Sequence, residues 1–382
     1  MASLSPDAQL RLRGDYISVL HAVDNGVVAG RSTLAIASWN NWSAFCRDLH
    51  IDPHLRQVHD PVTLLQIFGH RYRSGTLRPG GRPVRSRTVE DSIRCIAQTF
   101  TRVGAADPRL DSNNNIDFRL QRQLRSYSKE DPPPTRVKPI PVSVIIQTLA
   151  LAYATPSPGS HAIGDMTSLG FFFLLRPGEY TISPAESTPF RIQDVALRLA
   201  GQRLDLSTAP DADILNADFV TLEFDTQKSG VRGEVVGLGR SGIPHLCPVL
   251  ATARRIVHLR ANNAPPSQPL ATYFEAGVWH NVLSRDITAA LRATLAFVGP
   301  HTVGLSLTDI PARSLRASGA MALLVSKVDT DLIRLLGRWR SDEMLRYLHL
   351  QAQPIMQRFA RLMVTHGDYH LLPNSNVLPP PG

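Results

Sequence analysis

Residues 312–324 read ARSLRASGAMALL, and residues 335–351 read LLGRWRSDEMLRYLHLQ. The first stretch places Arg316 among small residues on an expected helix, where another backbone or a substrate can approach closely. The second places Arg338 just after one helix ends and Tyr347 nine residues later, on the next helix. A tyrosine at helical spacing is commonly a core residue, so the pattern also fits a packing role for Tyr347. The two stretches therefore indicate side chains held in place, for packing or for chemistry.

Arg313 lies three residues before Arg316, a spacing that puts both on one face of a helix. Two guanidinium groups on one face repel each other unless an anion lies between them or carboxylates neutralise them. The same spacing also fits an ordinary amphipathic helix whose arginines face solvent. The sequence alone leaves both interpretations open.

A third arginine follows an apolar run in FFFLLRPGEYTI, residues 171–182. The pattern predicts a buried helix that runs straight into Arg176 and is then broken by Pro177 and Gly178. Glu179 is near enough to orient the Arg176 side chain. The alternative is an arginine that stabilises the C-terminus of its own helix, where a cation is favoured in any case.

A lysine lies between two expected strands in FDTQKSGVRGEVV, residues 224–236. The pattern predicts a hairpin with Lys228 at its turn. A lysine at a hairpin tip can reach into a groove, but a solubilising turn lysine gives the same pattern.

Four cations and one phenol, remote in sequence, are suited to surround a single phosphodiester: Arg176, Lys228, Arg316, Arg338 and Tyr347. Arginine contacts phosphate through planar, bidentate hydrogen bonds, whereas lysine acts as a point charge. Such chemistry requires neither a metal nor a nucleotide, and the sequence contains no clear motif for either. We therefore expect no cofactor.

The composition fits a partner that carries phosphate. The 382 residues have a formal net charge of +9, most of it from arginine. Residues 1–137 contain 19 Lys and Arg against 13 Asp and Glu, a net charge of +6. A basic balance alone also occurs in proteins that bind no nucleic acid.

The periodicity predicts a mainly α-helical fold with a small antiparallel sheet, an α+β class in two domains. Helices are expected at 7–23, 32–49, 61–75, 88–104, 115–131, 142–154, 247–261, 287–299 and 315–325. Ser32 and Thr33 are candidates to cap the second of these helices. Short strands are expected at 191–200, 202–207, 218–227 and 233–239.

Three consecutive prolines at 132–134 stop the preceding helix and stiffen the chain. They predict a helical domain at 1–127, a linker at 128–140, a second domain at 141–367 and a flexible tail at 368–382. In the helical domain, SGTLRPGGRPVRSRT at 74–88 is a basic loop that carries Arg78, Arg82, Arg85 and Arg87. The loop fits a role in tracking DNA phosphates, and it equally fits a solvated loop.

The cysteines and the apolar runs indicate where the protein works. Three widely separated cysteines, with no CxxC pair, argue against a disulfide scaffold or a zinc module and favour a reducing compartment. No apolar run approaches the length of a membrane span, and the N-terminal residues show no secretory signal. We expect an intracellular protein without a membrane partner.

Taken together, these motifs resemble those of the tyrosine recombinases, or phage-type integrases, above all the versions encoded by eukaryotic mobile elements. The resemblance covers most of the chain and is sharpest in the two stretches quoted first. It implies an N-terminal core-binding domain and an integrase-like catalytic domain that act on double-stranded DNA. It implies that Arg176 and Arg316 are the two catalytic arginines and that Glu179 is the acid that supports the first. It further implies that Lys228 protonates the leaving oxygen and that Tyr347 is the nucleophile.

The chain departs from the family pattern at two positions. Arg313 stands where histidine is usual, and Arg338 stands where histidine or tryptophan is usual. Arginine cannot act as a general base because it stays protonated, although it can stabilise phosphate charge. Trp339, one residue on, fits the packing place of the family's tryptophan. The departures keep open a non-catalytic DNA-binding protein derived from a recombinase. A helical scaffold for protein interactions is a further alternative.

An apolar stripe after Tyr347 runs through Ile355, Met356, Phe359, Leu362 and Met363. It fits packing on its own domain. The family alternative is docking on a neighbouring protomer, which implies a homo-oligomer, a tetramer on DNA. A mobile-element origin in a eukaryote would also imply nuclear localisation.

Overall fold

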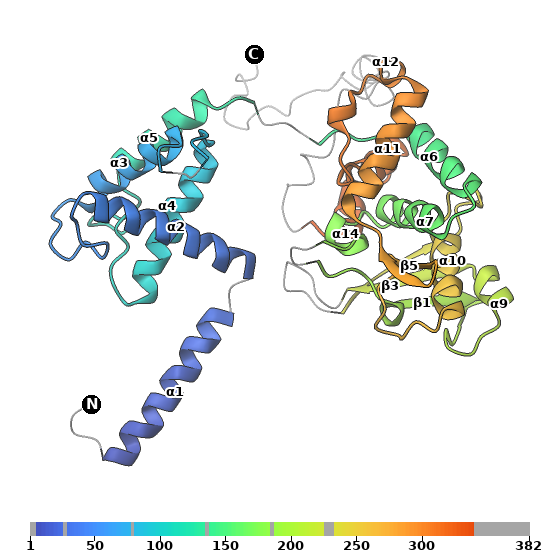
Figure 1. Ribbon diagram of the computed structural model, residues 1–382, viewed down its shortest axis with the longest axis horizontal. Coiled ribbons are helices and arrows are strands. Elements are labelled where there is room, and N and C mark those ends of the chain that lie inside the picture. Colours follow the sequence, from blue (N-terminus) through green and yellow to red (C-terminus); the bar gives the residue numbers. More distant parts are fainter. Residues whose placement is uncertain are drawn as a thin grey trace, which may run out of the picture. The chain divides into compact units, whose positions relative to one another are not determined.

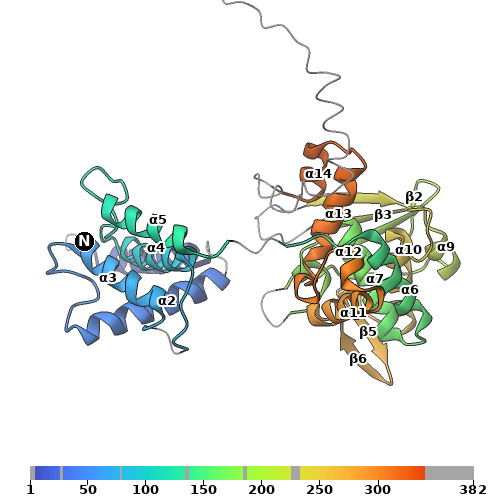
Figure 2. The same ribbon diagram turned by 90° about the horizontal axis from the view of Figure 1, so that it is seen from above.

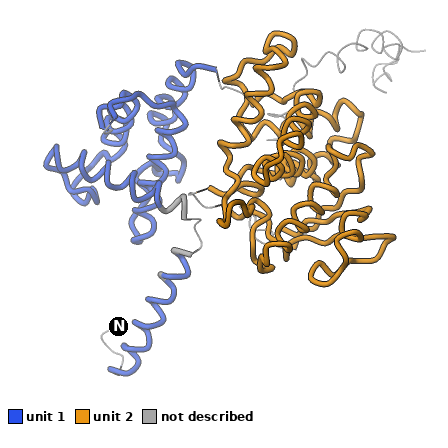
Figure 3. The backbone as a smooth tube through the Cα atoms, turned by 45° about the vertical axis from the view of Figure 1, so that its right-hand side comes forward, with its two compact units in different colours: residues 1–134 blue, residues 135–382 orange. Residues whose placement is uncertain are grey.

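The computed structural model describes residues 5–25, 29–77, 80–133, 137–183, 187–224 and 233–339. The chain divides into two compact units, residues 1–134 and 135–382 (Figure 3). The division falls at the end of the three prolines, inside the segment where the sequence places a linker. No helix among the described residues is long and apolar enough to cross a membrane.

Unit 1 is helical, as the periodicity predicts. Its core is built by aromatic and branched side chains that include Trp42, Phe45, Phe68, Ile93 and Leu120. Its helices are α1 (Pro6–Asn25), α2 (Ala29–Asp48), α3 (Pro61–Ser74), α4 (Ser86–Arg102) and α5 (Phe118–Glu130), shown in blue to green in Figure 1.

Two helix starts in unit 1 test the capping predictions. Pro61 is the first residue of α3, and the Asp60 carboxylate accepts a hydrogen bond from the backbone N–H of Thr63. The prediction for α2 is wrong, because the helix begins at Ala29 and therefore contains Ser32 and Thr33. Ser and Thr favour caps but are tolerated inside helices, so their presence does not fix a boundary.

Unit 2 combines helices with a four-stranded antiparallel sheet of order β2-β1-β3-β4. The strands are β1 (Val195–Leu199), β2 (Gln202–Arg203), β3 (Phe219–Phe224) and β4 (Glu234–Gly239). The helices are α6 (Val142–Ala154), α7 (Pro158–Phe172), α8 (Pro177–Tyr180), α9 (Asp211–Asn216), α10 (Pro248–Ala261), α11 (Ser284–Val298), α12 (Pro300–Val303), α13 (Ser314–Val325) and α14 (Thr330–Leu336). The predicted fold class, mainly α-helical with a small antiparallel sheet, is confirmed.

A second, two-stranded sheet was not expected from the sequence. It is the hairpin of β5 (Thr272–Glu275) and β6 (Val278–Asn281). The connection is tight because Ala276 and Gly277 both have positive φ, 50° and 81°. Figure 2 shows the hairpin at the opposite end of unit 2 from α13 and α14. The described part of unit 2 also contains the short 3₁₀ turns Ile192–Asp194 and Leu307–Asp309.

The core of unit 2 lies between the helices and the sheet. It includes Ile145, Leu169, Leu197, Ile256 and Leu291, from five different elements, all buried. A polar cluster is buried with them: the Asp165 carboxylate accepts hydrogen bonds from Tyr153 Oη at 2.9 Å and Arg254 Nε at 2.8 Å. Because every ion in this cluster has a partner, its burial is tolerated.

One histidine of this unit makes its stability depend on pH. His258 on α10 accepts a hydrogen bond from the backbone N–H of Phe274 on β5, at 3.0 Å. Burial, reinforced by the nearby Arg255, lowers the pKa of His258 to about 4. The folded state therefore holds the imidazole neutral where the unfolded chain, with a pKa of about 6.5, already binds a proton.

We expect the free energy of unfolding of unit 2 to be full above pH 6.5 and to fall as the pH is lowered toward 4. His258→Gln, whose amide oxygen can accept the same hydrogen bond but does not titrate, should lose part of this acid sensitivity. Urea denaturation at a series of pH values measures the difference. If the free energy of unfolding fell equally with pH in the wild type and in His258→Gln, the assignment would be contradicted.

Candidate active site

The first arginine of the site is fixed by a carboxylate three residues away. Arg176 is the N-cap residue of the short helix α8. Glu179 accepts a hydrogen bond from the backbone N–H of Arg176 at 2.8 Å and another from Arg176 Nη1 at 3.0 Å. The side chain of Arg176 remains 36% exposed. The expectation that Glu179 orients Arg176 matches this geometry.

The apolar helix before Arg176 does not reach it, contrary to the sequence prediction. Helix α7 ends at Phe172, and Leu174 then adopts a left-handed conformation with φ 49°. Pro177 does not simply break a helix but occupies the first position of α8. The reversal at Leu174 turns its carbonyl group toward side chains from distant parts of the chain.

The second arginine is buried against this reversal. Arg316 lies in the first turn of α13 and is only 3% exposed. Its Nη1 donates to the Leu174 carbonyl, and its Nη2 donates to the Gly337 carbonyl. Its guanidinium carbon lies 4.2 Å from the ring centroid of Trp339. Arg316 therefore joins the end of α7 to the end of α14.

The third arginine, Arg338, is also buried, and it follows α14 with a left-handed backbone (φ 56°). Its Nη2 donates to Glu179 Oε2 at 3.0 Å and to the Leu174 carbonyl at 3.4 Å. Its Nη1 donates to the carbonyls of Phe173 and Leu336, at 3.2 and 3.0 Å. Burial lowers the pKa of Arg338, and the negative charge of Glu179 opposes that shift.

Three arginines that are far apart in sequence thus share two acceptors. Glu179 accepts from Arg176 and Arg338, and the Leu174 carbonyl accepts from Arg316 and Arg338. Glu179 bonds two of the three guanidinium groups and Glu234 acts on Arg338 electrostatically, so two carboxylates against three guanidinium groups leave an excess of positive charge. A dense, partly buried cationic cluster of this kind is suited to bind an anion such as a phosphodiester.

Close packing at two glycines builds the cluster. A Cβ atom on Gly337 would lie 1.7 Å from Trp339, whose ring packs with Leu174, Ala320 and Ile333. A Cβ atom on Gly319 would lie 2.3 Å from both the Phe171 carbonyl oxygen and Leu174 Cδ2. The expected close approach at the small residues of α13 is thus made by the chain reversal after α7.

Gly319→Ala should therefore destabilise unit 2, because a methyl group at this position must displace the α7 backbone. Overpacking of this kind costs about 1–3 kcal/mol of unfolding free energy. Gly239→Ala is the matched control, because its new Cβ would meet nothing closer than 3.9 Å. Chemical denaturation of the two variants compares them, and equal midpoints would contradict the packing described here.

The structure locates the other candidate catalytic residues only in part. The spacing predicts that Arg313 and Arg316 lie on one face of a helix. In the structure Arg313 is the exposed N-cap residue of α13, whereas Arg316 is buried inside the helix. Lys228 and Tyr347 lie outside the described residues. The strands on either side of Lys228 are described, and β3 pairs with β4 up to Phe224 and Glu234, as a hairpin requires.

The candidate DNA-binding arginines of unit 1 lie before and at the start of α4. Arg82, Arg85 and Arg87 are exposed, and Arg85 is the N-cap residue of the helix. Arg87 forms ion pairs with Glu90 at 3.9 Å and Asp91 at 3.5 Å. Arg78 lies outside the described residues.

The sequence pointed to Glu179 as a partner of Arg176, but it did not reveal the carbonyl acceptors of the cluster. A backbone carbonyl such as that of Leu174 has no sequence signal. The aromatic partner of Arg338 was also missed: its guanidinium carbon lies 4.0 Å from the ring centroid of Phe224, at the end of β3. The available signal was that Phe224 lies in a predicted strand, a few residues before the predicted lysine turn.

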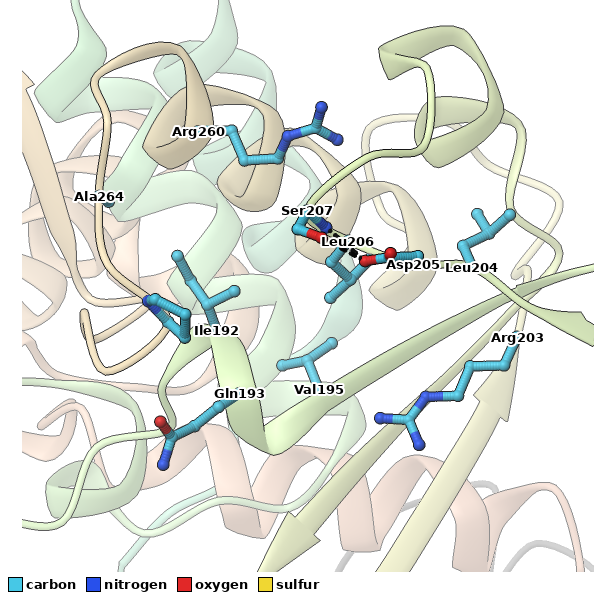
Figure 4. Close-up of a pocket in the computed structure, with 11 residues that line it drawn as sticks. Ile192, Gln193, Val195, Arg203, Leu204, Asp205, Leu206, Ser207, Arg260 and Ala264 are labelled. Carbon is cyan, nitrogen blue, oxygen red and sulfur yellow. Dashed lines mark hydrogen bonds between the residues drawn. The ribbon is translucent and has the colours of Figure 1, made fainter.

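A pocket of about 750 Å³ lies elsewhere in unit 2 and contains none of the predicted site residues (Figure 4). Three of its polar side chains already have partners, because Asp205 accepts from Ser207 and Arg260 donates to the Ala209 carbonyl. Within the described ranges, no group of three or more His, Cys, Asp or Glu is placed to hold a metal ion.

Comparison with known proteins gives similar folds at low identity. No family model matches the chain, and no curated protein does. A structure of the XerH site-specific recombinase bound to difH substrate in a pre-cleavage complex has a TM-score of 0.48 and 13% identity, covering 89% of this chain and 81% of that one. The Tn1549 transposon integrase in complex with transposon right end DNA has a TM-score of 0.42 and 12% identity, covering 78% and 85%. The integrase from mycobacterium phage Brujita has a TM-score of 0.30 and 14% identity, covering 88% and 87%. Because these TM-scores are below 0.5, the function proposed below rests on the residues of this chain alone.

Proposed function

We propose that this protein is a DNA strand-transferase that breaks and rejoins double-stranded DNA through a covalent 3′-phosphotyrosine intermediate. One observation carries the proposal: Arg338 shares the carboxylate of Glu179 with Arg176 and the carbonyl of Leu174 with Arg316, so three arginines remote in sequence form one cluster. A helical protein-interaction scaffold has no need for such a cluster, whereas phosphoryl transfer depends on it.

In the proposed reaction, the phenolate oxygen of Tyr347 attacks the phosphorus, and the bond to the 5′ oxygen breaks. Lys228 gives a proton to that leaving oxygen. A free tyrosine has a pKa of about 10, so nearby cations are needed to favour the phenolate at neutral pH. They also stabilise the additional charge on five-coordinate phosphorus. Because one phosphoester replaces another, rejoining requires no nucleotide.

Unit 1 would bind the DNA backbone through its exposed arginines, Arg82, Arg85 and Arg87, together with Arg78. The predicted basis is electrostatic, since each phosphate neutralised by arginine releases a condensed counterion. The proposal further includes a homo-oligomer, a tetramer on DNA, and integration or excision of a mobile element. In a eukaryotic host this activity would place the protein in the nucleus.

The test is a trapping assay with a pool of short nicked duplexes of varied sequence. When cleavage occurs next to a nick, the short 5′-hydroxyl strand diffuses away and the protein stays joined to the 3′ phosphate. We expect a covalent protein–DNA adduct that survives denaturation and forms without added metal or nucleotide. Salt-sensitive binding without any adduct would contradict strand transfer.

A DNA-binding protein without strand transfer is the second candidate, and one observation favours it. Arg338, at a position where the resemblance implies histidine or tryptophan, is buried, and both of its terminal nitrogens donate to protein acceptors. The trapping assay separates the two candidates, because this one predicts binding without covalent product.

A further inference from the structure

We propose that Arg338 is a positioning residue that acts through Glu179 on Arg176, and not a ligand of the DNA phosphate. The inference rests on the proposed function. It concerns the role of Arg338, which stands at a position usually held by histidine or tryptophan in the recombinases that the chain resembles. It replaces the expectation that Arg338 stabilises phosphate charge directly.

Burial and hydrogen bonding both keep Arg338 from a phosphate. Its side chain is 1% exposed, whereas that of Arg176 is 36% exposed. Its two terminal nitrogens donate to four protein acceptors, three carbonyl groups and Glu179. A phosphate could bind these two nitrogens only by displacing their acceptors, and the buried Phe173 and Leu336 carbonyls would lose their bonds to Arg338. The Nε atom of Arg338 has no partner, but it is itself buried.

The bridging carboxylate gives Arg338 its effect on Arg176. Glu179 Oε1 accepts from Arg176 and Oε2 from Arg338, both at 3.0 Å. Arg338 thus holds one oxygen of Glu179, and the other oxygen is kept in place to accept from Arg176. We infer that Arg338 orients Arg176 through this carboxylate.

Arg338 also contacts the base of the hairpin that carries Lys228. Its guanidinium carbon lies 4.0 Å from the ring centroid of Phe224, the last residue of β3. The left-handed backbone of Arg338 is fixed by its N–H, which donates to the Leu335 carbonyl at 2.9 Å. One residue thus ties the Glu179 carboxylate to the end of the strand before the lysine.

The experiment compares Arg338→Met with Arg176→Met, two neutral replacements of similar length in one cluster. The first readout is the slope of log Kobs against log salt for binding of a fixed duplex. A lost phosphate contact reduces this slope by about 0.9. We expect the reduction for Arg176→Met and an unchanged slope for Arg338→Met. A reduction of about 0.9 for Arg338→Met would overturn the proposal.

The second readout is the single-turnover rate of adduct formation. Misplacement of a reacting group by about 1 Å can cost about 100-fold, and we expect a loss of that order for Arg338→Met and for Glu179→Gln. The double variant Glu179→Gln/Arg338→Met should lose little more than either single variant, because both act through one contact. Multiplicative losses would overturn the proposal.

Separate control experiments distinguish a loss of folding from a loss of function. Arg338→Met leaves Glu179 with one cation fewer, so its fold is checked by circular dichroism. The double variant buries no unpaired charge, and it supplies the salt slope if the single variant does not fold. Arg338→Lys, which keeps the charge, should recover part of the rate. A wild-type protein that neither binds DNA nor forms an adduct would refute the proposed function itself, a result distinct from a changed slope in Arg338→Met.

Discussion

Tyr347→Phe should form no covalent adduct with any nicked duplex, because phenylalanine has no oxygen to attack the phosphorus. The effect is complete, since no other group can take the place of the phenol in a phosphotyrosine bond. The measurement is denaturing electrophoresis of labelled DNA after incubation with wild type and variant at equal concentration.

DNA binding supplies the control for this variant. The phenol hydroxyl carries no charge in the ground state, so Tyr347→Phe should bind a duplex with the affinity and salt dependence of the wild type. An adduct that persists in Tyr347→Phe would contradict the assignment of the nucleophile. A parallel loss of binding would show that Tyr347 is a core residue, the alternative that its helical spacing left open.

Arg316→Lys should have the second-largest effect, because it lowers both the rate and the stability. Arg316 is buried and bonded to protein carbonyls, so it acts by positioning, and misplacement of a reacting group by about 1 Å can cost about 100-fold in rate. Lysine cannot reproduce the two divergent contacts of Arg316 with the Leu174 and Gly337 carbonyls. A carbonyl left buried and unsatisfied costs about 1–3 kcal/mol, so the variant should also unfold at lower denaturant concentration.

The rate of adduct formation and the midpoint of unfolding are both measured for Arg316→Lys. Arg334→Lys is the matched control, since Arg334 lies on α14 with a side chain that is 43% exposed and forms a surface ion pair with Asp331. We expect the control to change neither quantity appreciably. A normal rate in Arg316→Lys would show that the guanidinium group is structural only.

Local sequence signals predicted those parts of the fold that local physics controls. The apolar run at 142–154 forms α6 with the predicted bounds, and the strands near Lys228 were found from their alternation and turn residues. The β5–β6 hairpin was missed, although Gly277 between runs rich in aromatic and β-branched residues was a usable signal.

The features that sequence could not supply are tertiary. Nothing between Phe171 and Leu175 signals a break, yet the chain reverses at Leu174 because Gly319 allows α13 to pack against it and buried arginines need its carbonyl. The pairing of Glu179 with Arg338 spans 159 residues, so no local pattern encodes it. Arg313 and Arg316 differ in burial because the helix begins between them.

The most direct test is to identify the residue that becomes joined to DNA. After trapping with nicked duplexes, nuclease and trypsin digestion should leave a nucleotide on one peptide. We expect this peptide to be YLHLQAQPIMQR, residues 347–358, modified at Tyr347. Attachment at any other residue, or DNA binding with no modified peptide from the whole pool of duplexes, would contradict the proposal that this arginine cluster serves strand transfer.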